Sequence, residues 1–138
     1  MKVIYKVSVI VSVLCAGIGC QNITVGYLMT RNAKYTPDSM VVKAVLDPVT
    51  DARRIQFRIP WQSTGMEGVE GTTPVRYSIR SIGSENAGFL SQFRMYGKGI
   101  IELPYNHTVP VGRYVINLRV ENEGYTHDLD SVFTVIVR

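Results

Sequence analysis

The chain has 138 residues, with 15 Lys and Arg against 11 Asp and Glu and a formal net charge of +4. This length suits one domain with a sizeable hydrophobic core. The basic residues are few and scattered, which argues against a nucleic-acid-binding surface.

The first residues have the three parts of an export signal. Lys2 and Lys6 give a basic start, residues 7–14 form the apolar run "VSVIVSVL", and small residues follow. The run is shorter than the about 20 apolar residues that a membrane-spanning helix needs. We therefore expect residues 1–19 to be a cleaved signal peptide, which leaves 119 residues with a net charge of +2.

The two cysteines, Cys15 and Cys20, lie in this stretch. A disulfide between them would close a very small loop in a segment that is removed, and a metal site lacks partners because the first 37 positions hold no His or acidic residue. Gly19 before Cys20 resembles the lipobox of bacterial lipoprotein signals, particularly the loose ones of Bacteroidetes, although those favour Leu where Gly17 stands.

The resemblance implies lipidation at Cys20 and loss of Cys15 with the signal. Acyl chains, at about 0.8 kcal/mol per buried methylene, would anchor the protein to a membrane. The alternative is plain secretion with an unprocessed Cys20. The expected organisation is a signal peptide at 1–19, a lipidated segment at 20–30 and one domain at 31–138.

Alternating apolar and polar residues dominate the rest of the chain and predict half-buried strands. The main candidates are residues 40–46, 54–59, 75–82, 114–120 and 132–137, and the shorter ones are 23–29, 93–96 and 100–103. The nearest helical candidate, 84–92, is short and contains Gly88. The pattern predicts an all-β antiparallel sandwich of seven or eight strands with Greek-key connections. The last strand reaches residue 138, as expected of a complete domain.

The alternation from Gly112 to Val120, followed by a glycine-containing turn and the alternation from Phe133 to Val137, resembles the closing hairpin of immunoglobulin-like, cadherin-like and PKD-type domains. This resemblance implies an immunoglobulin-like sandwich. It also implies that Tyr114 forms a tyrosine corner, with a buried ring and a hydroxyl bonded to an upstream backbone group.

The mature chain, including "PWQSTGMEGVEGTTPVRYSI" and "VPVGRYVINLRVENEGY", is similar to single-domain lipoproteins of Bacteroidetes. Comparable domains there often belong to cell-surface glycan-uptake systems. The implied location is the outer membrane, on its periplasmic side or at the cell surface. Surface-exported lipoproteins of Bacteroidetes often carry acidic residues just after the lipidated cysteine. Residues 21–25 contain none, so the resemblance favours the periplasmic side.

The polar, glycine-rich segment 61–74 is the main binding candidate. Trp61 offers an aromatic face for a sugar ring, and Gln62, Glu67 and Glu70 offer partners for its hydroxyls. Tyr105 and Tyr125 are weaker aromatic candidates. The structural alternative is that Trp61 packs at the rim of the sandwich while the glycines let a long loop turn.

The sequence contains few signals of catalysis or metal binding. The chain has no Gly-x-Ser-x-Gly, no phosphate-binding glycine loop and no free cysteine beside a base. The residues around His107 and His127 include neither the soft ligands of a transition-metal site nor an Asp-rich calcium loop. We expect no catalysis, metal or cofactor. Ser39 and Ser131, each between an Asp and an apolar residue, resemble the Asp-Ser/Thr-apolar O-glycosylation motif of Bacteroidetes envelope proteins, but Ser131 overlaps a predicted strand start.

The leading hypothesis is a membrane-anchored, non-catalytic binding or interaction module of the bacterial cell envelope, whose partner is a glycan or another envelope protein. The alternative is a structural or accessory subunit of an envelope complex with no ligand of its own.

Overall fold

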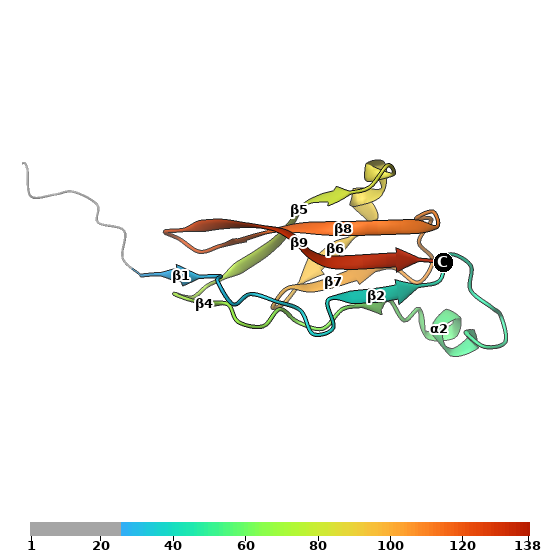
Figure 1. Ribbon diagram of the computed structural model, residues 1–138. Helices are drawn as coiled ribbons and strands as arrows, with labels where there is room; N and C mark the ends of the chain where they lie inside the picture. Colours follow the sequence, from blue (N-terminus) through green and yellow to red (C-terminus); the bar gives the residue numbers. More distant parts are fainter. Residues whose placement is uncertain (1–25) are drawn as a thin grey trace, which may run out of the picture.

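The computed structural model describes residues 26–138 (Figure 1). The expected signal peptide and the lipidation site at Cys20 lie outside these residues. Within the described part of the chain, no helix is long and apolar enough to cross a membrane.

Strands make up most of the ordered secondary structure. They are β1 (Leu28–Met29), β2 (Ser39–Val42), β3 (Trp61–Gln62), β4 (Glu70–Gly71), β5 (Arg76–Gly83), β6 (Arg94–Tyr96), β7 (Ile100–Leu103), β8 (Gly112–Glu121) and β9 (Thr126–Val137). The helical elements are α2 (Ala52–Phe57) and the 3-10 helix η1 (Ala87–Gln92). The all-β class is therefore confirmed.

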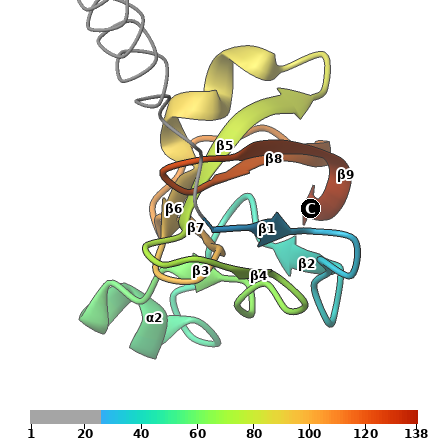
Figure 2. The same ribbon diagram turned by 90° about the vertical axis from the view of Figure 1, so that its left-hand side faces the viewer.

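The strands form two main sheets and one short ribbon. A four-stranded sheet has the order β2-β9-β8-β5, a three-stranded sheet has the order β3-β7-β6, and β1 pairs with β4. All pairs are antiparallel except β2 with β9, which is parallel. This parallel edge departs from the expected purely antiparallel arrangement. Figure 2 shows the same elements in an end-on view.

One hydrophobic core joins the sheets. Alternate residues of β8, from Tyr114 to Val120, have no exposed surface, and Phe133, Val135 and Val137 of β9 lie beside them. Ile101 and Leu103 of β7 contribute to the same core from the other sheet. The alternation predicted for these strands arises because only one face of each strand is buried.

The expected tyrosine corner is confirmed. Tyr114 is fully buried, and its hydroxyl donates to the carbonyl oxygen of Pro110 at 2.7 Å. Its ring also packs against Phe93, with the ring centroids 5.9 Å apart. This hydrogen bond holds the turn that leads into β8 against the start of the strand.

Two β-bulges interrupt the large sheet and meet at one side chain. The register shifts between Ile79 and Ser81 on β5, and again where β9 passes Asn117 of β8. The Asn117 side chain donates to the Ser81 hydroxyl at 3.0 Å and accepts from the Ser131 N–H at 2.8 Å. Ser131 has a positive φ of 55° in the second bulge. The candidate glycosylation site is thus an exposed residue inside β9 and not a flexible loop residue.

The strand expected at residues 54–59 is wrong, because Ala52–Phe57 forms helix α2. The alternation of Ile55, Phe57 and Ile59 fits a half-buried strand, yet all three side chains are exposed. Arg58 ends the helix in the left-handed conformation, with φ 53°. The Ile59 N–H donates to the Arg54 carbonyl at 3.0 Å, as in a Schellman cap.

The shorter strands and the 3-10 helix change three of the boundaries predicted from the sequence. Segment 61–74, expected to be a loop, contains β3 and β4. The short helical candidate at 84–92 is a 3-10 helix at Ala87–Gln92. Leu28 of β1 is part of the core, so packing begins three residues before the expected domain start at residue 31.

Candidate functional site

Trp61 is half-buried and contacts the core. The Arg54 guanidinium lies over the ring, with its central carbon 3.7 Å from the ring centroid. The indole N–H is buried and has no hydrogen-bond partner within the described residues. One ring face is therefore taken by Arg54, which leaves little open aromatic surface for a sugar.

The other three residues predicted to act with Trp61 are distributed over separate parts of the fold. The Gln62 amide donates to the Tyr96 hydroxyl at 2.8 Å and to the Glu102 carboxylate at 2.9 Å. Glu67 is exposed, and its backbone pairs with Lys34. Glu70 is on β4, opposite Met29. The structure does not bring the four residues together.

The remaining predicted residues are also apart. Tyr105 is half-buried just after β7, whereas Tyr125 is exposed in the turn between β8 and β9. Ser39 is the first residue of β2 and pairs with Thr134. They form no common site with segment 61–74.

Sequence reasoning missed the segment that we name the α2 loop, residues 43–60. This segment connects β2 with β3 and protrudes beside the C-terminus (Figure 1). Five of its apolar side chains are exposed: Val45, Val49, Ile55, Phe57 and Ile59. Val45 and Val49 are 83% and 84% exposed, and Phe57 is 63% exposed. The α2 loop is therefore the segment of the described chain that exposes the most large apolar side chains.

A polar network holds the first half of the α2 loop. The Asp47 carboxylate accepts from the N–H groups of Val49 at 2.7 Å and Thr50 at 3.1 Å. The Asp51 carboxylate accepts from the Lys43 ammonium at 2.8 Å and from the Asp47 N–H at 2.9 Å. These bonds lower the pKa of both carboxyl groups. The loop therefore has a defined shape although it exposes apolar side chains.

Arg54 holds the second half of the α2 loop in place. Its guanidinium donates to the carbonyl oxygens of Ile59 at 2.9 Å and Pro60 at 3.0 Å while covering Trp61. Because Trp61 belongs to β3, this cation joins α2 to the small sheet. A surface built on such a frame loses little conformational entropy when it binds.

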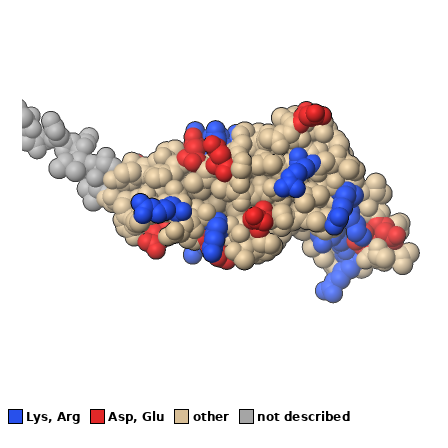
Figure 3. Space-filling view, in the orientation of Figure 1, with Lys and Arg blue, Asp and Glu red and all other residues tan. Residues whose placement is uncertain are grey.

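Two further cations flank the exposed apolar groups. Arg53 and Arg58 are exposed and take part in no ion pair among residues 26–138. Figure 3 shows Lys and Arg gathered at the end of the molecule where α2 lies, with a smaller acidic patch beside them. The α2 loop thus exposes both apolar side chains and the arginines Arg53 and Arg58.

His107 holds the base of the α2 loop. It is buried, its Nε2 lies 2.9 Å from the Lys43 carbonyl oxygen, and its Nδ1 accepts from the Val109 N–H at 3.1 Å. The neutral ring protonated on Nε2 satisfies both contacts, whereas a proton on Nδ1 would oppose the Val109 N–H. Burial lowers the pKa of His107 below 6.5, against the smaller opposing effect of the bond to Lys43.

Acidification should therefore destabilise the fold. Below pH 6.5 the unfolded chain binds a proton at His107 that the folded chain does not, so the free energy of unfolding should fall as pH drops from 6.5 towards the lower folded pKa. Urea unfolding between pH 7.5 and 5.5 measures this. In His107→Gln the slope in this window should be smaller, and an unchanged slope would contradict the assignment.

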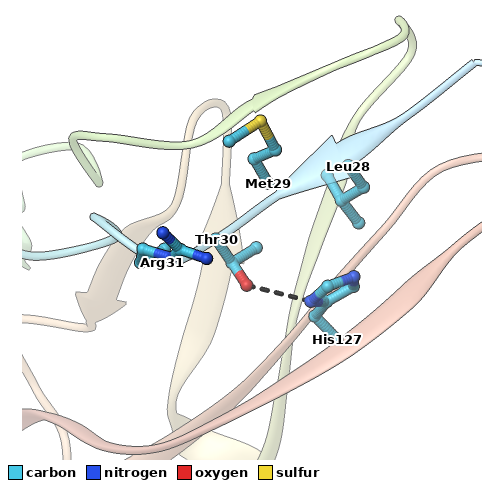
Figure 4. Close-up of a pocket in the computed structure, with 5 residues that line it drawn as sticks. All are labelled: Leu28, Met29, Thr30, Arg31 and His127. Carbon is cyan, nitrogen blue, oxygen red and sulfur yellow. Dashed lines mark hydrogen bonds between the residues drawn. The ribbon is translucent and has the colours of Figure 1, made fainter.

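A hollow of about 350 Å³ lies at the opposite end of the domain, beside β1 (Figure 4). Its lining residues are Leu28, Met29, Thr30, Arg31 and His127. Thr30 Oγ1 and His127 Nδ1 are 3.0 Å apart and hydrogen-bonded. The hollow thus combines an apolar floor with a guanidinium, an imidazole and a hydroxyl.

A second hollow, of about 450 Å³, lies between β4, β5 and the turn before β7. Tyr77 and Lys98 provide its aromatic and cationic groups, and Met66 and Val69 line it with apolar surface. Burial raises the pKa of Tyr77, which keeps its phenol protonated. None of the predicted site residues lines either hollow.

No group of three or more His, Cys, Asp or Glu side chains that could hold a metal ion occurs in the described part of the chain. Comparison with protein-family models, with curated proteins and with solved structures found no match.

Proposed function

We propose that this chain is a non-catalytic protein-interaction module of the bacterial cell envelope, tethered to the membrane by acyl chains on Cys20 and binding its partner through the α2 loop. One observation carries the proposal: the loop holds five exposed apolar side chains on a hydrogen-bonded frame. Contiguous exposed apolar patches on soluble proteins mark interaction sites, and we take the five side chains as one such surface.

The strand order supports an immunoglobulin-like sandwich as the scaffold. In that fold, strands C, F and G share one sheet, and B, E and D share the other. Here β5, β8 and β9 are neighbours in the order C-F-G, while β3, β7 and β6 follow the order B-E-D. The tyrosine corner at Tyr114 lies on β8, the strand equivalent to F. Such domains commonly bind partners through the loops at the ends of the sandwich.

The positions of β1 and the α2 loop at opposite ends of the domain are consistent with a tethered module. β1 lies at one end, and the α2 loop and the C-terminus lie at the other (Figure 1). Cys20 precedes Gly26 by six residues, a span of at most about 20 Å for an extended chain. Lipidation at Cys20 would therefore keep the β1 end near the membrane and direct the α2 loop away from it.

A protein partner fits the α2 loop better than a glycan. Arg54 covers one face of Trp61, and the Gln62 amide is already engaged by Tyr96 and Glu102. The α2 loop instead exposes Phe57 and neighbouring aliphatic groups beside arginines. Aromatic and arginine side chains are enriched at the energetic centres of protein interfaces.

One experiment in cells tests both halves of the proposal. A photo-crosslinking phenylalanine analogue is placed at Phe57 or, as a control, at Arg94, which is exposed on β6. The cells are fed an alkyne fatty acid. We expect acyl label on the chain, loss of the label in Cys20→Ala and its retention in Cys15→Ala. We also expect a discrete adduct from position 57 and none from position 94.

The acyl label and the crosslinked adduct test the tether and the binding surface independently. Label that persists in Cys20→Ala would refute the tether. Equal adducts from positions 57 and 94, or an adduct from position 57 that survives Val49→Asp, would refute the α2 loop as the binding surface. Val49 is a suitable site because its side chain is 84% exposed, so the aspartate does not enter the core.

A further inference from the structure

We propose that the hollow beside β1 binds the phosphate of a membrane lipid headgroup and so sets the orientation of the domain on the membrane. This inference rests on the proposed tether at Cys20. It concerns the end of the molecule opposite the α2 loop.

The hollow has the chemistry of a phosphate site. Arg31 takes part in no ion pair within residues 26–138, and a guanidinium can bind two phosphate oxygens at once. Arg31 lines the same hollow as Thr30, whose hydroxyl faces the His127 ring (Figure 4). The bond between Thr30 and His127 positions both groups before any ligand arrives. A volume of about 350 Å³ is sufficient for a phosphate group.

Two exposed tyrosines lie close in sequence to residues that line this hollow. Tyr27 precedes Leu28, and Tyr125 is in the turn that leads into β9, the strand of His127. Tyrosine is enriched where a membrane meets water, because its ring is apolar and its hydroxyl is polar. These side chains would rest at headgroup level while the hollow holds a phosphate.

The buried Asn122 amide and Thr72 hold the β1 end together. The Asn122 side chain donates to the Tyr27 carbonyl oxygen at 2.8 Å and accepts from the Tyr125 N–H at 2.9 Å. Thr72 exchanges bonds with Tyr27 through its N–H at 3.0 Å and its hydroxyl at 3.1 Å. The N-terminal strand, β4 and the β8–β9 turn therefore present one preformed surface.

The short tether brings this surface to the lipids. At most about 20 Å of extended chain separates Cys20 from Gly26. The headgroup layer is the first part of the membrane that the β1 end would meet. A free anion in solution would gain nothing from this placement, so the observations favour a lipid phosphate.

Carboxylates limit how the surface attracts lipids. Glu70 on β4 and Glu123 in the β8–β9 turn are exposed at the same end. They oppose a general attraction to anionic membranes. We therefore expect a discrete phosphate contact, with a zwitterionic phosphatidylcholine surface sufficient for binding.

The test uses the full mature lipoprotein purified from membranes. Hydrogen exchange is compared between a phosphate-free maltoside micelle and nanodiscs of phosphatidylcholine. In nanodiscs we expect the amides of residues 26–31 and 125–129 to exchange about tenfold more slowly, since charge-assisted bonds to phosphate suppress local opening. Arg31→Gln should remove this protection, His127→Gln should reduce it, and Arg94→Gln on β6 should keep it.

Further readouts separate the outcomes. Intact mass reports acylation, so an unacylated chain would refute the tether and, with it, the lipid proposal. An acylated chain with equal exchange in micelles and nanodiscs, or with protection that Arg31→Gln leaves intact, would overturn the hollow alone. In micelles, glycerophosphocholine should shift the His127 ring resonances more strongly than inorganic phosphate at equal concentration. The reverse order would indicate a site for a free anion and would also overturn the proposal.

Discussion

Replacing Tyr114 by alanine should lower the free energy of unfolding by about 3–5 kcal/mol, the loss expected for a buried aromatic ring. Tyr114→Phe keeps the ring but leaves the Pro110 carbonyl without its 2.7 Å donor, and should cost about 1–3 kcal/mol. The ring is fully buried and packs against Phe93. The two variants therefore separate packing from hydrogen bonding, and urea unfolding measures both.

The control for the hydroxyl is Tyr125→Phe. Tyr125 is exposed in the β8–β9 turn, so the loss of its hydroxyl should change stability by less than about 0.5 kcal/mol. If Tyr114→Phe were as stable as the wild type, the hydroxyl would not anchor the turn before β8. Tyr114 would then stabilise the fold through the packing of its ring alone.

The sequence predicted β8 and the second half of β9, residues 132–137, because local pattern and burial agree there. Every second residue from Tyr114 to Val120 faces the core, so the two-residue period is visible without knowledge of the partner strands. The parallel pairing of β2 with β9 left no such trace. The pairing depends on which strand lies at the edge of the sheet. That edge is formed with β9, which lies at the far end of the chain from β2.

The α2 loop shows why the same period can mislead. Residues 54–59 alternate as a strand would, but no neighbouring strand is available to them, and the bonds of Asp47 and Asp51 shape the chain just before the helix. The spacing of Lys43, Asp47 and Asp51 is the signal that could have pointed to a local turn, since each is four residues from the next.

The candidate sites were harder to predict than the fold, because they join distant residues. Trp61 and Glu70 are nine residues apart but pair with β7 and β1 respectively. Conversely, Thr30 and His127 are 97 residues apart and share a hydrogen bond. Only the strand pairings reveal such neighbours, so composition alone suggested segment 61–74 and gave no indication of the β1 hollow.

Gly68→Ala should destabilise the domain by at least about 2 kcal/mol and loosen the β1 end. Gly68 has a φ of +78°, a conformation that costs an alanine about 1–2 kcal/mol. A Cβ at this position would also meet the backbone carbonyl of Asn32. One of the two segments would have to move, at the point where Lys34 and Glu67 exchange backbone bonds of 3.0 and 2.8 Å.

The matched control is Gly88→Ala, because a Cβ at Gly88 in η1 meets nothing within 4 Å. Thermal unfolding should separate the two variants, and hydrogen exchange should show faster exchange at residues 26–35 in Gly68→Ala alone. Since Asn32 directly follows Arg31, that displacement should also weaken the phosphate contact without altering any group that lines the hollow. Normal stability together with normal exchange in Gly68→Ala would mean that the segment before β2 adapts freely, and the β1 surface would then not be preformed.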